Sequence, residues 1–300
     1  MKNLKSYLKI AEKNKVAIGH FNISDIAALK AIFEATVEFS KQFKTPFGEK
    51  TPVMIGVSEG ERDFVGVRQA AALVKSLREE YNWPIFLNAD HTHTLAKIKQ
   101  AAEAGFDEVL FDGGKMPLKD NIKETIKVVK YIKKNHPEIL VEGELGYIGS
   151  SSEILTSLPE GAAFRLEDLT KPEEAAKFTR ETGVDLLAPA VGNIHGIIAN
   201  IKNPELNIAR IRELKEAVGK NVGIVLHGGS GTSDKEFQDA ILAGVSIIHI
   251  NTELRVAWRK GVETGLKNNP TEVAPYKILP PAIQMMKEVV LNRLKIFNRV

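Results

Sequence analysis

The sequence VLHGGSG at residues 225–231 ends a hydrophobic run in a histidine, followed by three glycines around one serine. Two structures explain such an ending: a plain turn out of a strand, or a ligand-binding strand end where bare backbone approaches an anion. The run belongs to a set of eight apolar, β-branched segments typical of parallel strands covered on both faces. They span 16–22, 52–58, 84–91, 108–114, 139–146, 186–192, 222–229 and 246–252.

Between these runs, apolar residues recur at spacings of three and four, which predicts amphipathic helices. Eight strands that alternate with helices over about 250 residues predict a (β/α)₈ TIM barrel, with a doubly wound open sheet as the alternative. No linker or shift in composition divides the chain, so we expect a single domain over residues 1–300. The segment 280–300 predicts an extra C-terminal helix, which we interpret as an oligomer contact.

Composition narrows the class of protein. Hydrophobic residues make up 43% of the 300-residue chain, enough for a large core. The net charge of +3 produces no field that would attract nucleic acid or a membrane surface. Without cysteine, any metal must be bound by His, Asp or Glu. No apolar run approaches the roughly 18 residues of a membrane span, and no secretory signal is recognisable, so we expect a cytoplasmic protein.

Polar residues gather where the predicted strands end. In a barrel all eight carboxyl ends meet at one mouth, where active sites lie. One buried histidine is usually structural, but four at the ends of four strands favour a common site. The four are His91, His195, His227 and His249; the other three, His20, His93 and His136, have weaker claims.

A zinc site follows from this arrangement. Three histidines and an open fourth position are typical of catalytic zinc, and His91, His195 and His227 are the natural trio because a small residue follows each. Asp90, directly before His91, could act as an acid/base beside the metal. Its alternative role is to orient a histidine.

The glycines after His227 predict a phosphate site. Gly228, Gly229 and Ser230 expose backbone N–H groups, and a helix is expected from about Asp234. TIM barrels hold phosphate after strands seven and eight, where Thr252 would complete the pocket. Flexible loops share this composition, so the position after the seventh strand carries the argument.

Five segments resemble, as a set and in order, the class II metal-dependent fructose-bisphosphate and tagatose-bisphosphate aldolases. They are NADHTHTLAKIKQAAEAGFDEVLFDGG (88–114), VEGELGYIG (141–149), VGNIHG (191–196), LHGGSG (226–231) and INTELR (250–255). The likeness extends over nearly the whole chain. It implies reversible cleavage of a ketose bisphosphate to dihydroxyacetone phosphate and glyceraldehyde 3-phosphate by a homodimer or homotetramer.

The resemblance also implies roles for single residues. His91, His195 and His227 would bind Zn²⁺, and Asp90 would handle the C4 hydroxyl. Asp112 and Glu144 match ligands of a second divalent metal, and the family leaves room for a monovalent cation. Ser58 and Arg255 are candidates for the far end of the substrate. Dihydroxyacetone phosphate would be bound by Gly196, Gly228, Gly229, Ser230, His249, Ile250, Asn251 and Thr252.

The connection at 147–171 predicts an active-site lid because it is long for a compact barrel. The family uses an acidic residue of this mobile loop to remove a proton from dihydroxyacetone phosphate. Glu153 is the nearest candidate, one position from the expected place. An ordinary surface glutamate is the alternative.

Two residues depart from the family pattern. His249 stands where Asn is usual, and its imidazole could alter substrate handling or add a metal ligand. Asn251 stands where fructose-type relatives have Asp and tagatose-type relatives have Ala, so the C4 epimer stays open. Two alternatives therefore remain: a zinc-dependent epimerase or aldolase acting on another sugar phosphate, and a non-catalytic barrel that binds metal or ligand.

Overall fold

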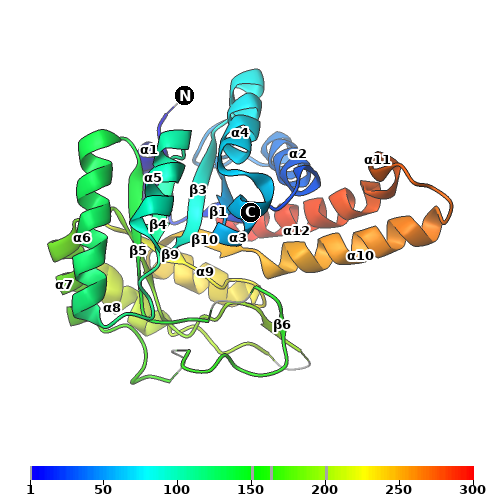
Figure 1. The fold of residues 1–300 in the computed structure, drawn as a ribbon. Helices are drawn as coiled ribbons and strands as arrows, with labels where there is room; N and C mark the ends of the chain where they lie inside the picture. The colour runs from blue at the N-terminus through cyan, green and yellow to red at the C-terminus, as the bar shows by residue number, and fades with distance from the viewer. Residues whose placement is uncertain (1, 150–151, 163–164, 200–201) are drawn as a thin grey trace.

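The computed structural model describes residues 2–149, 152–162, 165–199 and 202–300 (Figure 1). Its main sheet is a closed parallel barrel in the order β1-β10-β9-β7-β5-β4-β3-β2, which confirms the predicted TIM barrel over the open sheet. Each barrel strand overlaps one predicted run. The strands are β1 (Ile18–Asn22), β2 (Val53–Val57), β3 (Ile85–Thr92), β4 (Glu108–Phe111), β5 (Leu140–Leu145), β7 (Leu186–Pro189), β9 (Gly223–Leu226) and β10 (Val245–Ile250).

Helices surround the barrel. Residues with strong helix-capping preferences mark several of their ends: Ser233 forms a capping box with Glu236, Pro172 begins a helix, and Gly183 and Gly244 follow helix ends. None of the described helices is both long and apolar enough to span a bilayer. The helices are α1 (Leu4–Asn14), α2 (Ile26–Gln42), α3 (Glu59–Val65), α4 (Val67–Tyr81), α5 (Leu95–Ala104), α6 (Leu118–Asn135), α7 (Pro172–Thr182), α8 (Ile208–Val218), α9 (Asp234–Ala243), α10 (Thr252–Asn268), α11 (Pro275–Ile278) and α12 (Pro280–Asn298).

The inside of the barrel has two levels. The lower level, toward the amino ends of the strands, is apolar, and α1 closes it with Leu4, Tyr7 and Leu8. One strand period higher, the inward residues of β1, β3, β5 and β10 and the one directly after β9 are polar and remain buried, whereas β2 and β7 have Gly56 and Ala188 at this level. The lower level contains Ile18, Met54, Phe86, Leu140, Leu186, Val225 and Ile247; the upper level contains His20, Asn88, Glu108, Glu142, His227 and His249.

Two features lie outside the barrel. The predicted C-terminal helix is α12, which pairs with α10 in a long hairpin that leaves the barrel (Figure 1). Near its tip Val273 and Tyr276 are 88% and 76% exposed. A second, two-stranded sheet pairs β6 (Ile154–Leu155) with β8 (Ile197–Ile198), which joins the predicted lid to the loop after β7. Sequence analysis did not predict this small sheet.

Candidate active site

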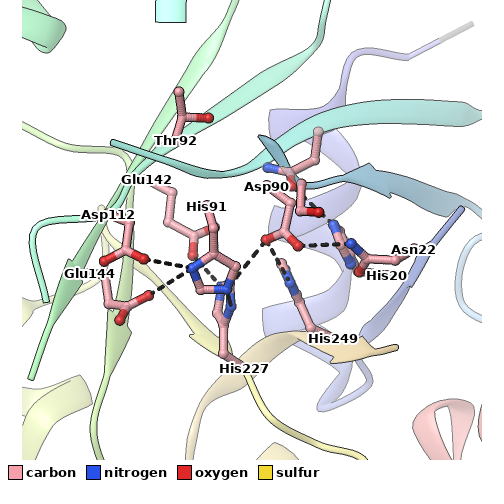
Figure 2. Close-up of polar contacts among 12 residues, drawn as sticks. His20, Asn22, Asp90, His91, Thr92, Asp112, Glu142, Glu144, His227 and His249 are labelled. Carbon is pink, nitrogen blue, oxygen red and sulfur yellow. Dashed lines mark hydrogen bonds and ion pairs between the residues drawn. The ribbon is translucent and has the colours of Figure 1, made fainter. Parts of the chain in front are cut away.

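A local distortion at the end of β3 places two functional side chains next to each other. The pairing of β3 with β4 shifts register between Ala89 and Thr92, and His91 has a φ of 37°. This left-handed conformation is costly for a residue with a Cβ, so the surroundings must hold it. As a result, the consecutive side chains of Asp90 and His91 both enter the cluster drawn in Figure 2.

Arg62 of α3 secures this distortion. Its side chain is 2% exposed and donates hydrogen bonds to the carbonyl oxygens of Val57 and Asp90 and to Thr92 Oγ1. The Asp90 and Thr92 contacts measure 3.1 and 2.7 Å and lie on either side of His91. A guanidinium presents its donors from three nitrogens in a rigid plane and can therefore hold oxygens that lie apart, whereas the three donors of a lysine are all on one nitrogen.

The predicted zinc ligands converge. Ligand nitrogens of His91, His195 and His227 lie within 4.8 Å of one another, and His91 Nε2 is 3.1 Å from His227 Nδ1. A zinc ion binds imidazole nitrogens at about 2.0–2.1 Å, so small rotations would place all three around one ion. Gly228 allows this approach, because a Cβ there would lie 2.4 Å from the carbonyl oxygen of Ile194.

Carboxylates behind two of these rings determine which nitrogens face the centre. His91 Nδ1 lies 2.9 Å from Asp112 Oδ2, and His227 Nε2 lies 2.8 Å from Glu142 Oε1. If these nitrogens donate to the carboxylates, the two facing nitrogens present lone pairs only 3.1 Å apart and need a cation between them. Buried His195 Nε2 has no hydrogen-bond partner among the described residues. The residues therefore fit a bound metal.

Protonation agrees with metal binding for two of the ligands. Burial lowers the pKa of His227 to about 3 and that of His195 well below its usual value, so both are neutral, as ligands must be. Burial also opposes charge on His91, but Asp90, Asp112 and Glu144 together raise its pKa well above the usual value. A cation in the centre would take the place of the proton that these carboxylates favour.

Three further groups of described residues meet the distance criterion for a metal, and Glu142, His227 and His249 form one of them. His91, Asp112 and Glu144 offer ligand atoms within 4.8 Å, at the predicted second-metal position. His20, Asp90 and His249 meet the same distance criterion. However, the His20 and His249 rings are stacked 3.4 Å apart at 5°, so their in-plane lone pairs run side by side and cannot both point at one ion.

Asp90 is positioned as a buried carboxylate. Asn22 Nδ2 donates to its Oδ2 at 2.9 Å, and its Oδ1 lies 3.7 Å from His91 Nε2 and 3.6 Å from His249 Nδ1. Burial alone would raise the pKa of Asp90, but His91 and His249 hold it well below its usual value. The group is therefore ionised, which is the form in which a carboxylate can accept a proton.

A small cavity next to Asp90 contains most of the predicted phosphate-binding residues. Gly229 N–H already donates to His249 O, and Gly231 N–H donates to Glu253 Oε1, so the N–H groups of Gly228 and Ser230 are the candidate anion donors in this loop. The amino end of α10 faces the same space, which favours an anion. The cavity is lined by Asn22, Asp90, Ser152, His195, Gly196, Gly228, Ser230, His249, Asn251 and Thr252.

Other predicted residues lie elsewhere. The side chain of Ile250 packs in the core between barrel and helices, so only its backbone could contact a ligand. Glu153 is exposed and lines a groove of about 920 Å³ beside the mouth. Ser150 and Ser151, in the predicted lid, are outside the described residues. Ser58 caps α3, and its N–H donates to Glu61 Oε2 at 2.8 Å.

Glu61 is a functional candidate that sequence analysis missed. It is 6% exposed and accepts hydrogen bonds from Asn22 at 2.8 Å and from Arg255 at 2.7 Å. Arg255 also donates to the carbonyl oxygen of Ser152 in the lid segment at 3.0 Å. The capping-box pattern beginning at Ser58 could have identified Glu61 as a helix residue, but not its contact with Arg255 far along the chain.

Comparison with known proteins agrees with this geometry. Residues 2–300 match the family profile described as fructose-bisphosphate aldolase class-II. The fructose-bisphosphate aldolases of Geobacillus stearothermophilus and Staphylococcus aureus (strain Mu50) are each 32% identical to this chain over 299 residues, which covers 99% of the chain and 96% of the relative.

Solved structures share the fold. The X-ray crystal structure of the YdjI aldolase from Escherichia coli K12 aligns with a TM-score of 0.79 at 26% identity, and covers 98% of this chain and 96% of that one. The fructose-bisphosphate aldolase of Campylobacter jejuni aligns with a TM-score of 0.78 at 20% identity, over 99% and 94% of the two chains. At that identity the likeness shows the fold alone.

Proposed function

Because this chain belongs to the class II fructose-bisphosphate aldolase family, and is therefore a carbon–carbon lyase, we propose that it is zinc-dependent and cleaves a ketose bisphosphate. The substrate is fructose 1,6-bisphosphate or tagatose 1,6-bisphosphate, and the products are dihydroxyacetone phosphate and glyceraldehyde 3-phosphate. One observation carries the proposal: the nitrogens of His91, His195 and His227 meet within 4.8 Å beside the buried carboxylate of Asp90.

Two sets of residues form the proposed metal site: three histidines that bind the ion and two carboxylates that orient them. His91, His195 and His227 hold the zinc ion, which when bound acts as a Lewis acid that polarises the substrate ketone. Asp112 and Glu142 hold the His91 and His227 rings by their far nitrogens. Such partners fix the tautomer and orientation of a ligand.

Asp90 moves the proton that cleavage requires. It accepts the proton of the C4 hydroxyl while the C3–C4 bond breaks, C4 becomes the aldehyde carbonyl, and the bonding electron pair passes to C3. C3 must then take up a proton from a second group. We assign this step to Glu153 in the lid segment, which is at the rim of the mouth in the described structure.

The dihydroxyacetone phosphate end occupies the cavity after β9 and β10. Gly228 and Ser230 offer backbone N–H groups there, and Thr252 begins α10. Gly196 lies across the cavity, and a Cβ at this position would lie 2.8 Å from the carbonyl oxygen of Glu153. Glu253, whose charge would oppose phosphate, is paired by Arg293 at 2.8 Å.

A second candidate substrate is another sugar phosphate, and a specific contact favours it. Arg255, the predicted partner of the far phosphate, is already paired with the buried Glu61 at 2.7 Å. A second phosphate would have to compete with that carboxylate. A zinc-dependent aldolase or epimerase acting on a sugar with one phosphate would not.

Assembly and location complete the proposal. We propose that residues 1–300 form one barrel domain of a cytoplasmic homodimer or homotetramer. The α10–α12 hairpin projects from the barrel and exposes Val273 and Tyr276 near its tip, which suits a contact between copies (Figure 1). Light scattering on the purified protein measures the copy number, and a strictly monomeric mass would contradict this part.

The decisive experiment combines metal analysis with cleavage assays. Purified protein is expected to contain about one zinc per chain and to release dihydroxyacetone phosphate from at least one of the two bisphosphates. A panel of ketose 1-phosphates tests the second candidate in parallel. A zinc-loaded protein that cleaves none of these sugars would overturn the proposed activity.

A further inference from the structure

Three histidine rings form a row inside the barrel, from β1 through β10 to β9. His20 and His249 are register partners on β1 and β10, and their rings stack 3.4 Å apart at an angle of 5°. The His249 ring lies 3.8 Å from that of His227, tilted by 36°. Figure 2 shows this row beside Asp90. His249 therefore has an imidazole on each face, and its freedom to rotate is limited.

The His20 ring is held from its far side. Its Nε2 lies 3.0 Å from Asn88 Oδ1, and Asn88 belongs to β3, so the ring reaches across the intervening strand β2. Gly56 on β2 makes that reach possible, because a Cβ there would lie 2.1 Å from His20 Cε1. All three residues are on the upper level of the barrel, and His20 and Asn88 are completely buried.

The row ends against the carboxylate of Asp90. Asn22 holds Oδ2 at 2.9 Å, and His249 Nδ1 faces Oδ1 at 3.6 Å. His249 Nε2 is buried and has no hydrogen-bond partner among the described residues. The orientation of the His249 ring thus determines whether Nδ1 faces Asp90, and the stack with His20 limits that orientation.

We propose that His20 is a positioning residue: by stacking on His249 it keeps the Nδ1 edge of that imidazole toward Asp90, and so fixes the carboxylate that moves the C4 proton. This inference rests on the proposed function of Asp90. Three residues then act together to hold the His249 ring: Gly56 provides the space, Asn88 anchors the His20 ring, and His20 supports His249.

A purely space-filling role explains these contacts less well. Two residues earlier on the same strand, the barrel fills the same kind of space with Ile18. His20 instead buries an Nδ1 that lacks a hydrogen-bond partner among the described residues, which is unfavourable. It also requires a glycine on the neighbouring strand.

The test uses His20→Ala, which removes the stack, and His20→Phe, which keeps a ring in place. Asp90 acts on cleavage, whereas proton exchange into dihydroxyacetone phosphate uses a different base. His20→Ala should therefore lower kcat for cleavage by about 10–100-fold, the scale of a small misplacement of a catalytic group. Proton exchange and KM should change much less, and His20→Phe should recover part of the loss.

Two controls separate positioning from damage to the metal site. Zinc content and the visible spectrum of the cobalt-substituted enzyme should be the same in His20→Ala as in wild type. His136→Ala removes another imidazole that lies beside an aromatic ring, Tyr131, at the end of α6, and it should leave cleavage unchanged. If His20→Ala fails to fold, Gly56→Ala displaces the ring while His20 is kept, and the same kinetic split is expected.

A double-mutant cycle between residues 20 and 249 is the strictest test of this inference. If His20 acts through His249, His20→Ala should have little further effect on kcat in a His249→Asn background. Additive losses, or equal losses of cleavage, exchange and zinc, would overturn the inference. If wild type cleaves no ketose phosphate, the proposed function fails instead. The coupling energy between residues 20 and 249, obtained from proton-exchange rates or from unfolding free energies of the same variants, then shows whether the stack itself is correct.

Discussion

The two levels of the barrel interior are built on the same strands, yet they have opposite chemistry. On β1 the inward residue changes from Ile18 to His20, and on β5 from Leu140 to Glu142, in one strand period. The lower residues form an apolar cluster closed by α1, whereas the upper residues include buried polar atoms that have no hydrogen-bond partner within the described part of the chain. The lower level therefore stabilises the barrel, whereas the upper level forms the candidate site at a cost in stability.

Removal of the metal should have the largest effect and should affect only the upper level. Because His91, His195 and His227 are the proposed ligands of one zinc ion, EDTA is expected to abolish cleavage, and Zn²⁺ to restore it. The measurement is aldolase activity before and after dialysis, with circular dichroism as a check on the fold. Full activity in EDTA, with borohydride trapping of substrate on a lysine, would show a Schiff-base mechanism instead.

Asp90→Ala should remove chemistry without removing the metal. Asp90 is not one of the three histidine ligands, and a general acid/base contributes about 10²–10⁴-fold in rate, so cleavage should fall by at least that order. Proton exchange into dihydroxyacetone phosphate should be lowered less. Zinc content, cleavage and exchange are measured on the same preparation; equal loss of all three would mean that Asp90 holds the site together.

Leu8→Ala tests the lower level. Leu8 of α1 is 7% exposed within the apolar cluster, and such a truncation costs about 2–5 kcal/mol of stability. Urea unfolding should show that loss, while kcat per folded molecule stays within about two-fold, since stability and site are on different levels. A large fall in kcat at full folding would show that the two levels are coupled.

Glu108→Gln tests how much stability the buried polar residues of the upper level cost. Burial and the neighbouring Glu142 raise the pKa of Glu108 well above its usual value, and Glu142 itself is raised to about 7, chiefly by burial. A carboxyl whose pKa is higher in the folded than in the unfolded state does not lower stability at a pH below its unfolded pKa, near 4.5. It destabilises the fold as pH rises through the folded pKa.

The metal-free wild type should therefore lose stability from about pH 5 to pH 8, by about 1.4 kcal/mol for each unit of raised pKa. Glu108→Gln should lose less over the same range. Thermal unfolding of both proteins at pH 5 and pH 8 measures this difference. Parallel curves for the two proteins would mean that Glu108 does not ionise in this range.

His249→Asn should have the smallest effect. It restores the usual family residue in the cavity, whose side-chain amide can donate to Asp90 without a stacked neighbour, so we expect stability to change by about 1 kcal/mol and turnover, or the preference between the two bisphosphates, to shift by only several-fold. Kinetics on both sugars and urea unfolding test this expectation. A large stability loss with unchanged kinetics would show that His249 is a packing residue.

Much of the fold could be predicted because hydrophobic periodicity is local. Each of the eight apolar runs overlaps a barrel strand, and the run at 222–229 contains β9. The strand-end rule also placed His91, His195 and His227 at one mouth, where the structure brings their nitrogens together; their roles remain predictions. The small sheet of β6 and β8 was missed because strands of two residues are too short to show a periodic pattern.

The sequence by itself determined where the barrel strands lie and that both of their faces are covered, since a continuous apolar run is a property of neighbouring residues. It could not show that His20, a single histidine early in the chain, belongs to the site. Only the tertiary structure decided that, because barrel closure pairs the first strand with the last and brings His20 against His249. The contact of Glu61 with Arg255 has the same origin. Such contacts depend on how the ends of the sheet meet, and no local pattern contains that information.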